Sequence, residues 1–434
     1  METLWYLLGI LILILGLAIS IGIHEFGHLI PAKKFGVRVP HWAIGFGPKL
    51  FSKKFGETEY SIRLIPLGGF ITLIGMFPPA RDGKDDSKRW FSRSIRSARN
   101  AHSEHEQPGD ENRKFYQLSA WKRIVVMFGG PVTNLILGTL LIVLAYSAIG
   151  VPQRVNTVQK VVGCESQMLD TAAICKATEP SSPAKAAGLL PGDQIIRVNS
   201  ETVSPTQDLK PMLESAKPVV LSVVRDGKTL EITVVPALAD LPYLVNGQWA
   251  TDANGTPLLK QRPYIGVSWE QQRIGVGVDK SFAYAMTVTG DTFAMLVKFP
   301  QQVYSALESA VTGTPRDPNS VVSIVGVGQA AGELTANSSI DIVDRLVMNL
   351  NLLGALNLAL FAFNMIPLPP LDGGHIAGAL YEYVKRGFYR IAGIRKRATV
   401  DTALMAPVAT TVFVLLLFAG LAMMLVDIVN PIKF

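Results

Sequence analysis

Cysteine and charged residues are scarce in this 434-residue chain. Only two cysteines occur, Cys164 and Cys175, too few for a disulfide scaffold or a cysteine-rich zinc module. Charged residues make up 17% of the chain and hydrophobic residues 49%, which excludes two ordinary soluble domains and indicates an integral membrane protein. The net charge is +7, but the basic residues do not interleave with aromatics in a recognisable motif, so no nucleic-acid partner is expected.

Four apolar stretches are long enough to cross a lipid bilayer, which takes about 20 helical residues. They are Leu4–Ile30, Ile124–Gly150, Leu346–Ile366 and Leu404–Val426. The first starts beside Glu2 rather than a basic residue and exceeds the apolar run of a signal peptide, so a mature helix is expected. The sequence therefore predicts a multi-pass α-helical membrane protein with four transmembrane helices.

Basic residues gather in two of the segments that join these stretches. They are Lys33, Lys34, Lys49, Lys53, Lys54, Arg63, Lys122 and Arg123 in one segment, and Lys385, Arg386, Arg390, Arg395, Lys396 and Arg397 in the other. The positive-inside rule places both segments in the cytosol and the region 151–345 outside it. Because that side can be oxidising, Cys164 and Cys175 could form a local disulfide, with two free thiols as the alternative.

The first apolar stretch ends in "IGIHEFGHLI", residues 21–30. In a helix His24 and His28 are one i, i+4 step apart, so both imidazoles project from one face and can bind one Zn²⁺. Glu25 is placed to take a proton from the water that attacks a peptide carbonyl. Two histidines that only hydrogen-bond between helices are the alternative, but ionisable groups inside a span are costly and usually mark a functional site.

A catalytic zinc needs a third protein ligand. The other polar cluster at membrane depth is "NMIPLPPLDGGH", Asn364–His375, where prolines interrupt the helix. Asp372 is the only carboxylate there, and coordination to zinc would compensate its charge. His375 is a competing ligand, and an Asp372 that only caps a helix remains possible, so the residues alone favour Asp372 without deciding the question.

The outer region contains a compact pattern of helix, turn and strands. "SPAKAAGLLPGDQIIRVN", Ser182–Asn199, predicts a short helix, a Pro-Gly-Asp turn and a strand, and two further alternating strands are joined at Asp226–Gly227. This pattern resembles a bacterial PDZ domain at 155–237, with an unrelated α+β domain as the alternative. Beyond it, apolar residues at helical spacing within Ser281–Val311 predict amphipathic helices at the membrane surface or packed on that domain.

These motifs, together with "FGGPVTN" at Phe128–Asn134, occur in the order found in bacterial site-2 proteases, the intramembrane zinc metalloproteases. The chain resembles that family over nearly its whole length. The resemblance implies His24, His28 and Asp372 as zinc ligands, Glu25 as catalytic base, and Asn364 as a residue that contacts the unwound substrate. It also implies a re-entrant β-hairpin after the first helix. Many family members carry two tandem PDZ domains, whereas this chain has room for one recognisable copy.

The motifs and the resemblance together define an expected organisation. It comprises 1–31, the first transmembrane helix with the zinc motif; 32–79, a re-entrant β region; 80–120, a flexible cytosolic loop; 121–150, the second transmembrane helix; 155–237, the PDZ-like domain; 238–344, an outer extension with amphipathic helices; 345–376, the third transmembrane helix with the third-ligand motif; and 404–428, the fourth transmembrane helix.

The expected function is that of a zinc endopeptidase in the bacterial plasma membrane, with its active site toward the cytosol and its PDZ-like domain outside. The resemblance implies single-pass membrane proteins as substrates, anti-sigma factors among them. One alternative is a membrane zinc protease of the chamber type, whose third ligand is usually a downstream Glu. The other is a PDZ-bearing membrane scaffold in which the histidines only join helices.

Overall fold

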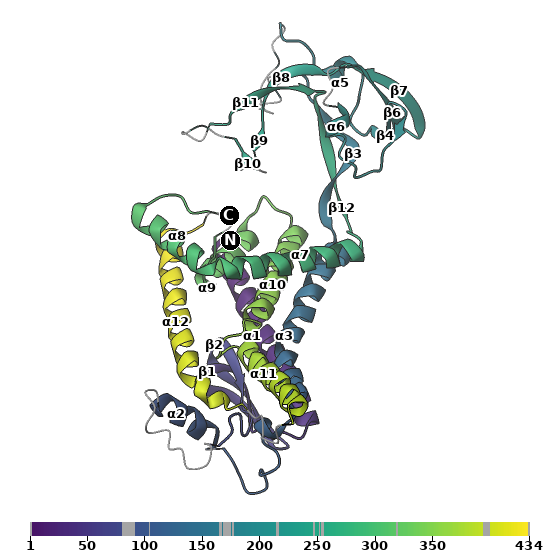
Figure 1. Cartoon of the computed structure of the whole chain (residues 1–434). Coiled ribbons are helices and arrows are strands. Elements are labelled where there is room, and N and C mark those ends of the chain that lie inside the picture. The colour runs from purple at the N-terminus through teal and green to yellow at the C-terminus, as the bar shows by residue number, and fades with distance from the viewer. Residues whose placement is uncertain are drawn as a thin grey trace. The chain divides into compact units, whose positions relative to one another are not determined.

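The computed structural model divides the chain into two compact units. They are a helical unit formed by Met1–Gly150 and Gly275–Phe434, and a sheet unit formed by Val151–Ile274. The structure describes residues 2–79, 92–103, 105–164, 167, 175, 178–213, 217–245, 248–250, 252, 256–317, 320–393 and 400–432 (Figure 1).

Four helices of the described residues are long and apolar enough to cross a membrane. They are α1 (Glu2–Lys34), α3 (Ala120–Val143, continued to Ile149), α10 (Ile342–Asn364) and α12 (Ala406–Val429). Their outward faces carry exposed leucine, isoleucine and phenylalanine side chains, which suit a lipid environment. The four helices that the sequence predicts are thus present, and each is a candidate membrane span.

Glycines allow the backbones of α1, α3 and α10 to approach closely. A Cβ added at Gly27 would lie 2.3 Å from the carbonyl oxygen of Gly129, and one added at Gly138 would lie 2.7 Å from that of Gly354. Such small residues are the usual means of close helix packing in membranes, where apolar burial gives little driving force. The three helices therefore run side by side (Figure 1).

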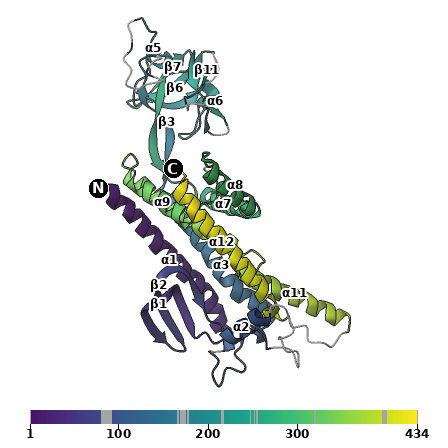
Figure 2. The same cartoon turned by 90° about the vertical axis from the view of Figure 1, so that its left-hand side faces the viewer.

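A long β-hairpin follows α1 and packs against it. Its antiparallel strands are β1 (His41–Phe55) and β2 (Thr58–Ile71), and the register shifts around Phe46. Trp42 packs against Phe26 of α1 with ring centroids 4.6 Å apart. The far part of the hairpin, visible beside α1 in Figure 2, exposes many apolar side chains. These are Phe46, Leu50, Phe51, Phe55, Ile62, Leu64 and Ile65.

The polar stretch expected to be a flexible loop contains a helix. Residues 80–91 lie outside the described residues, but α2 (Ser92–Ser103) follows them. Arg99 of α2 forms a 2.6 Å ion pair with Asp401, just before α12. The sequence does not show this partner because it lies about 300 positions away, so the pattern alone indicated only a polar loop.

Four further helices complete the helical unit. They are α7 (Val278–Val297), α8 (Phe299–Thr312), α9 (Ile324–Ala336) and α11 (Asp372–Ile391). α7 and α8 lie across one end of the transmembrane helices (Figure 1). A buried ion pair between Arg316 and Asp427 joins the segment after α8 to the end of α12. Asp427 also accepts hydrogen bonds from the backbone N–H groups of Ser323 and Gly326 at the start of α9.

The sheet unit is built on a six-stranded antiparallel sheet in the order β12-β3-β4-β6-β7, with β5 paired to β4. The strands are β3 (Val151–Val161), β4 (Gln194–Val198), β5 (Glu201–Thr202), β6 (Val219–Arg225), β7 (Lys228–Val234) and β12 (Val267–Ile274). Two smaller pairs are β8 (Ala237–Pro242) with β11 (Leu259–Tyr264), and β9 (Leu244–Val245) with β10 (Gln248–Trp249). The predicted hairpin at Asp226–Gly227 is confirmed, and both residues adopt positive φ.

An apolar core and two local links stabilise the sheet unit. The short helices α5 (Pro183–Ala186) and α6 (Lys210–Leu213) contribute to a core around the fully buried Leu221. Cys164 and Cys175 form a disulfide with Cα atoms 5.8 Å apart. Burial alone would raise the pKa of Asp193, but the Arg225 guanidinium, 2.6 Å away, and the N–H of Leu190 outweigh it and lower that pKa.

Candidate active site

Three potential metal ligands converge inside the helical unit. His24 and His28 lie one turn apart on α1, and Asp372 is the first residue of α11. The two Nε2 atoms are 3.1 Å apart, and each lies 3.3 Å from Oδ2 of Asp372. Among the described residues this is the one group of three His, Cys, Asp or Glu side chains whose ligand atoms come within 4.8 Å of one another.

The spacing of these atoms fits zinc. Ligand atoms placed tetrahedrally at about 2.0–2.1 Å from Zn²⁺ are about 3.3 Å from each other. Oδ2 of Asp372 is buried and has no hydrogen-bond partner, which is costly for a carboxylate unless a cation binds it. Three protein ligands also leave the fourth zinc position for water, as in catalytic rather than structural sites.

The second transmembrane helix holds His28 in place. Nδ1 of His28 lies 2.8 Å from the carbonyl oxygen of Val126 in α3, so this nitrogen donates and Nε2 is left for a metal. The imidazole lies against Gly130, where an added Cβ would be 2.2 Å from Nε2. Gly130 of the "FGGPVTN" motif thus makes room for the ring, and Gly129 makes room for the α1 backbone at Gly27, roles that the sequence motif did not reveal.

The side chain of Glu25, on α1, packs against the β-hairpin. Its side chain is buried, and a Cβ added at Gly69 of β2 would lie 2.9 Å from Cγ of Glu25. Its carboxylate is close enough to His28 and Asp372 to interact electrostatically with both, without being one of the three ligands. A buried carboxylate between a metal centre and a strand is suitably placed to exchange protons with water and substrate.

Asn364 and His375 lie outside the group of three ligands. Asn364 is the last residue of α10, and its amide nitrogen donates to the carbonyl of Leu360, 3.0 Å away. His375, one turn beyond Asp372 on α11, lies near Phe77 with ring centroids 6.4 Å apart. His375 also lines an apolar cavity of about 390 Å³. Of the two ligands that the sequence left open, the structure brings Asp372 to the histidines.

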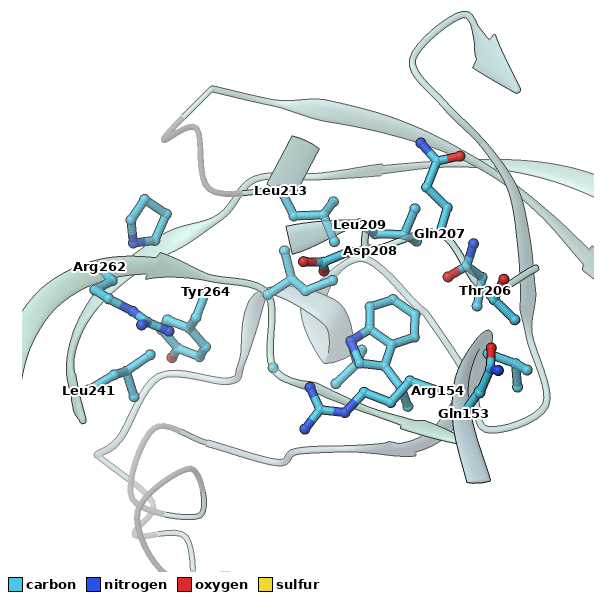
Figure 3. A pocket seen from close by; sticks show the side chains of 17 residues that line it. Gln153, Arg154, Thr206, Gln207, Asp208, Leu209, Leu213, Leu241, Arg262 and Tyr264 are labelled. Carbon is cyan, nitrogen blue, oxygen red and sulfur yellow. The ribbon is translucent and has the colours of Figure 1, made fainter. Parts of the chain in front are cut away.

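The sheet unit has a cavity of its own, of about 590 Å³, shown in Figure 3. It is lined by β3 residues, by residues that precede or end α6, including Asp208 and Leu213, and by residues between Arg262 and Trp269. Arg154 and Arg262 both contribute guanidinium groups to it (Figure 3). The cavity contains no cluster of metal ligands among the residues that the structure describes.

Comparison with known proteins identifies the class of enzyme. The model of peptidase family M50 matches residues 12–405, and the chain belongs to this family, so the resemblance drawn from the motifs is confirmed. Zinc metalloprotease Rip1 of Mycobacterium tuberculosis is 30% identical over 440 residues, which cover 99% of both chains. Metalloprotease MmpA of Caulobacter vibrioides is 25% identical over 406 residues, covering 90% of this chain and 91% of MmpA. The protein is thus a membrane-integrated zinc metalloprotease with Zn²⁺ as its cofactor.

Proposed function

We propose that this protein is an intramembrane endopeptidase that cleaves the transmembrane segments of single-pass membrane proteins, with His24, His28 and Asp372 as its zinc ligands. The observation that carries the proposal is the convergence of three atoms at 3.1–3.3 Å. Two are Nε2 atoms of α1, a helix apolar enough to span a membrane, and the third is a carboxylate oxygen at the start of α11. A bound zinc ion supplies Lewis-acid chemistry, polarising a carbonyl and acidifying water.

Glu25 is the proposed proton carrier. As water adds to the scissile carbonyl carbon, one water proton passes to the Glu25 carboxylate, and the same proton then moves to the amide nitrogen as the C–N bond breaks. The protein holds Glu25 in place for this transfer, because Glu25 follows His24 on α1 and its side chain packs against Gly69 of the hairpin.

The β1–β2 hairpin is the proposed binding site for the substrate backbone. A helical substrate has its peptide groups hydrogen-bonded internally, so local unwinding must expose them before cleavage. A strand edge can accept the unwound segment by β-augmentation. The apolar side chains exposed on the hairpin support a re-entrant position in the membrane. We assign Asn364 the task of contacting the unwound segment, since its side chain ends α10 close in sequence to Asp372.

The sheet unit is proposed to be an extracytoplasmic PDZ-like domain that acts as a size filter. Its disulfide supports an oxidising location, and the basic residues beside α1 and α3 support a cytosolic location for the opposite ends. Substrates shortened outside the membrane, such as anti-sigma factors, would then pass the filter. Replacing 151–274 by a short linker between Gly150 and Gly275 should allow cleavage of untrimmed substrates. If these substrates stay intact, the filter role is wrong.

The decisive experiment compares membrane proteomes of cells that carry the wild-type enzyme or Glu25→Gln. Single-pass proteins should accumulate in the Glu25→Gln strain, and their cleavage sites should lie within transmembrane segments. If the substrates were soluble or prenylated proteins instead, a chamber-type protease would be favoured. Asp372 rather than a Glu lies at the histidines, which argues against that type.

A further inference from the structure

Three buried polar atoms beside the metal site have no hydrogen-bond partner in the protein. They are Nδ1 of His24, Oδ1 of Asn134 and Oδ1 of Asn357. The two asparagines are 1% and 0% exposed. A buried polar atom without a partner costs free energy, and in a membrane helix no bulk water can compensate it. Three such atoms on neighbouring helices therefore need an explanation.

The three atoms come from α1, α3 and α10, and interhelical contacts bring the residues that carry them within about one helical turn of each other along the bundle. The Thr133 hydroxyl lies 3.3 Å from the carbonyl oxygen of Ile23, so the α3 residues 133–134 lie beside the α1 residues 23–24. The Asn357 amide nitrogen donates to the hydroxyl of Ser20, one turn before His24 on α1. α3 and α10 are in contact at Gly138 and Gly354, one turn away from Asn134 and Asn357.

The orientation of the Asn357 amide is fixed by its neighbours. Nδ2 donates to the Ser20 hydroxyl at 3.0 Å and to the Leu353 carbonyl at 2.8 Å. Because the Leu353 carbonyl can only accept, the Asn357 atom that faces it must be the amide nitrogen. The other amide atom is therefore the oxygen Oδ1, an acceptor that lacks a donor. Oδ1 of Asn134 on α3 is a second buried oxygen without a partner.

His24 requires an acceptor on Nδ1 when its Nε2 faces a metal. His28 has one, the Val126 carbonyl at 2.8 Å. The carbonyl of Gly130 also approaches His24. It already accepts a hydrogen bond from the Thr133 hydroxyl at 2.7 Å, and because Gly130 lies in α3, it also accepts the helical N–H of residue 134. Its two lone pairs are therefore in use. His24 is left as a donor beside two acceptors without donors.

We propose that one buried water joins these atoms, accepting the N–H of His24 Nδ1 and donating to Oδ1 of Asn134 and Oδ1 of Asn357. One water with three partners is the usual coordination of buried water in proteins. The water satisfies all three atoms, fixes the tautomer of His24 and presents its Nε2 to zinc. Asn134 and Asn357 are thus positioning residues for a zinc ligand, an inference that rests on the proposed zinc site.

The test measures zinc affinity of the full-length protein in detergent, by competition with a chelator. Asn134→Leu and Asn357→Leu should each weaken zinc binding by about 10- to 100-fold, the usual cost of losing a partner of a metal-bound histidine. Because both act through one water, the double variant should be within about threefold of the weaker single variant. In Co²⁺-substituted protein, both variants should change the visible absorption spectrum.

Two further variants separate positioning from general damage. Asn349→Leu removes another buried α10 asparagine, about 12 Å along the helix, which bonds Thr335 and Arg345 instead. It should leave zinc affinity and the Co²⁺ spectrum unchanged. Asn134→Asp keeps an acceptor oxygen and should retain zinc affinity, which a merely structural asparagine would not predict. If a leucine variant does not fold, the corresponding alanine variants are compared with Asn349→Ala.

The outcomes distinguish this inference from the proposed function. Zinc missing from the wild-type protein overturns both. If the wild type binds zinc and the asparagine variants bind it with unchanged affinity, only the inferred role of the water and of Asn134 and Asn357 is overturned. Additive losses in the double variant overturn the shared water, because two independent supports would then be present.

Discussion

Each unit buries at least one carboxylate in a pair with an arginine, but the helical unit also buries a group that is left unpaired. In the sheet unit, the carboxylate of Asp193 is fully buried but is matched by Arg225, whose guanidinium lies 2.6 Å away. In the helical unit, His24, His28 and Asp372 direct their free atoms toward one point and leave the Asp372 oxygen without a hydrogen bond. A buried group that is paired within the protein stabilises a fold, whereas several left unpaired around one point indicate a ligand.

The largest expected effect is the loss of zinc affinity when the unpaired carboxylate of Asp372 is removed. Asp372→Asn removes the charge that compensates zinc and should lower zinc affinity by at least about 100-fold, because the site loses one of three ligands. Zinc content after dialysis against a mild chelator measures this. His375→Asn is the matched control on the same helix and should retain zinc. If His375→Asn loses zinc and Asp372→Asn keeps it, the ligand assignment is wrong.

The second prediction concerns the space around His28. In Gly130→Ala, the new Cβ would lie 2.2 Å from Nε2 of His28, so the imidazole or α3 must shift. We expect roughly a 10- to 100-fold loss of zinc affinity, comparable with the loss of a ligand's support. Gly420→Ala in α12 is the control, since nothing lies within 4 Å of its added Cβ. Equal zinc affinity in both variants would contradict the proposed packing.

The sequence was sufficient to predict the metal ligands of the helical unit, but not the groups that hold those ligands in place. His24 and His28 were predictable because helical spacing alone places them together. Asp372 was predictable only as a requirement for a third ligand, since no local pattern shows that α11 starts beside α1. The Val126 carbonyl could not be predicted at all, because every residue has a carbonyl and only packing selects one. Likewise the contact of α2 with the segment before α12 is made by Arg99 and Asp401, which are remote in sequence.

The third prediction tests the paired carboxylate. Asp193→Asn leaves the Arg225 guanidinium without its partner and should lower the melting temperature of the sheet unit by several degrees, with zinc affinity unchanged. Hydrogen exchange of the full-length protein can follow the sheet unit separately. Lys228→Gln, at the exposed start of β7, is the control and should have no effect. A parallel loss of zinc would show that the two units are energetically coupled.

The pH dependence of the same pair follows from the lowered pKa of Asp193. Since the folded-state pKa lies below the unfolded value of about 3.9, the ion pair contributes its full stability above that value. The contribution is lost as the pH falls from about 3.9 through the folded-state pKa. Acid unfolding of the sheet unit should therefore be less steep in Asp193→Asn than in the wild type. Identical acid transitions would show that Asp193 does not titrate on unfolding.

The smallest effect is expected for the disulfide. Cys164 and Cys175 are 11 positions apart, and a link across so short a loop contributes at most about 3 kcal/mol to stability. The Cys164→Ser/Cys175→Ser variant should keep its zinc content and lose modest stability in the sheet unit. In intact cells, a maleimide reagent should label wild-type protein only after reduction. Labelling without reduction would contradict an oxidising location of the sheet unit. Because the two cysteines are bonded to each other within that unit, this result would leave the assignment of the zinc ligands unchanged.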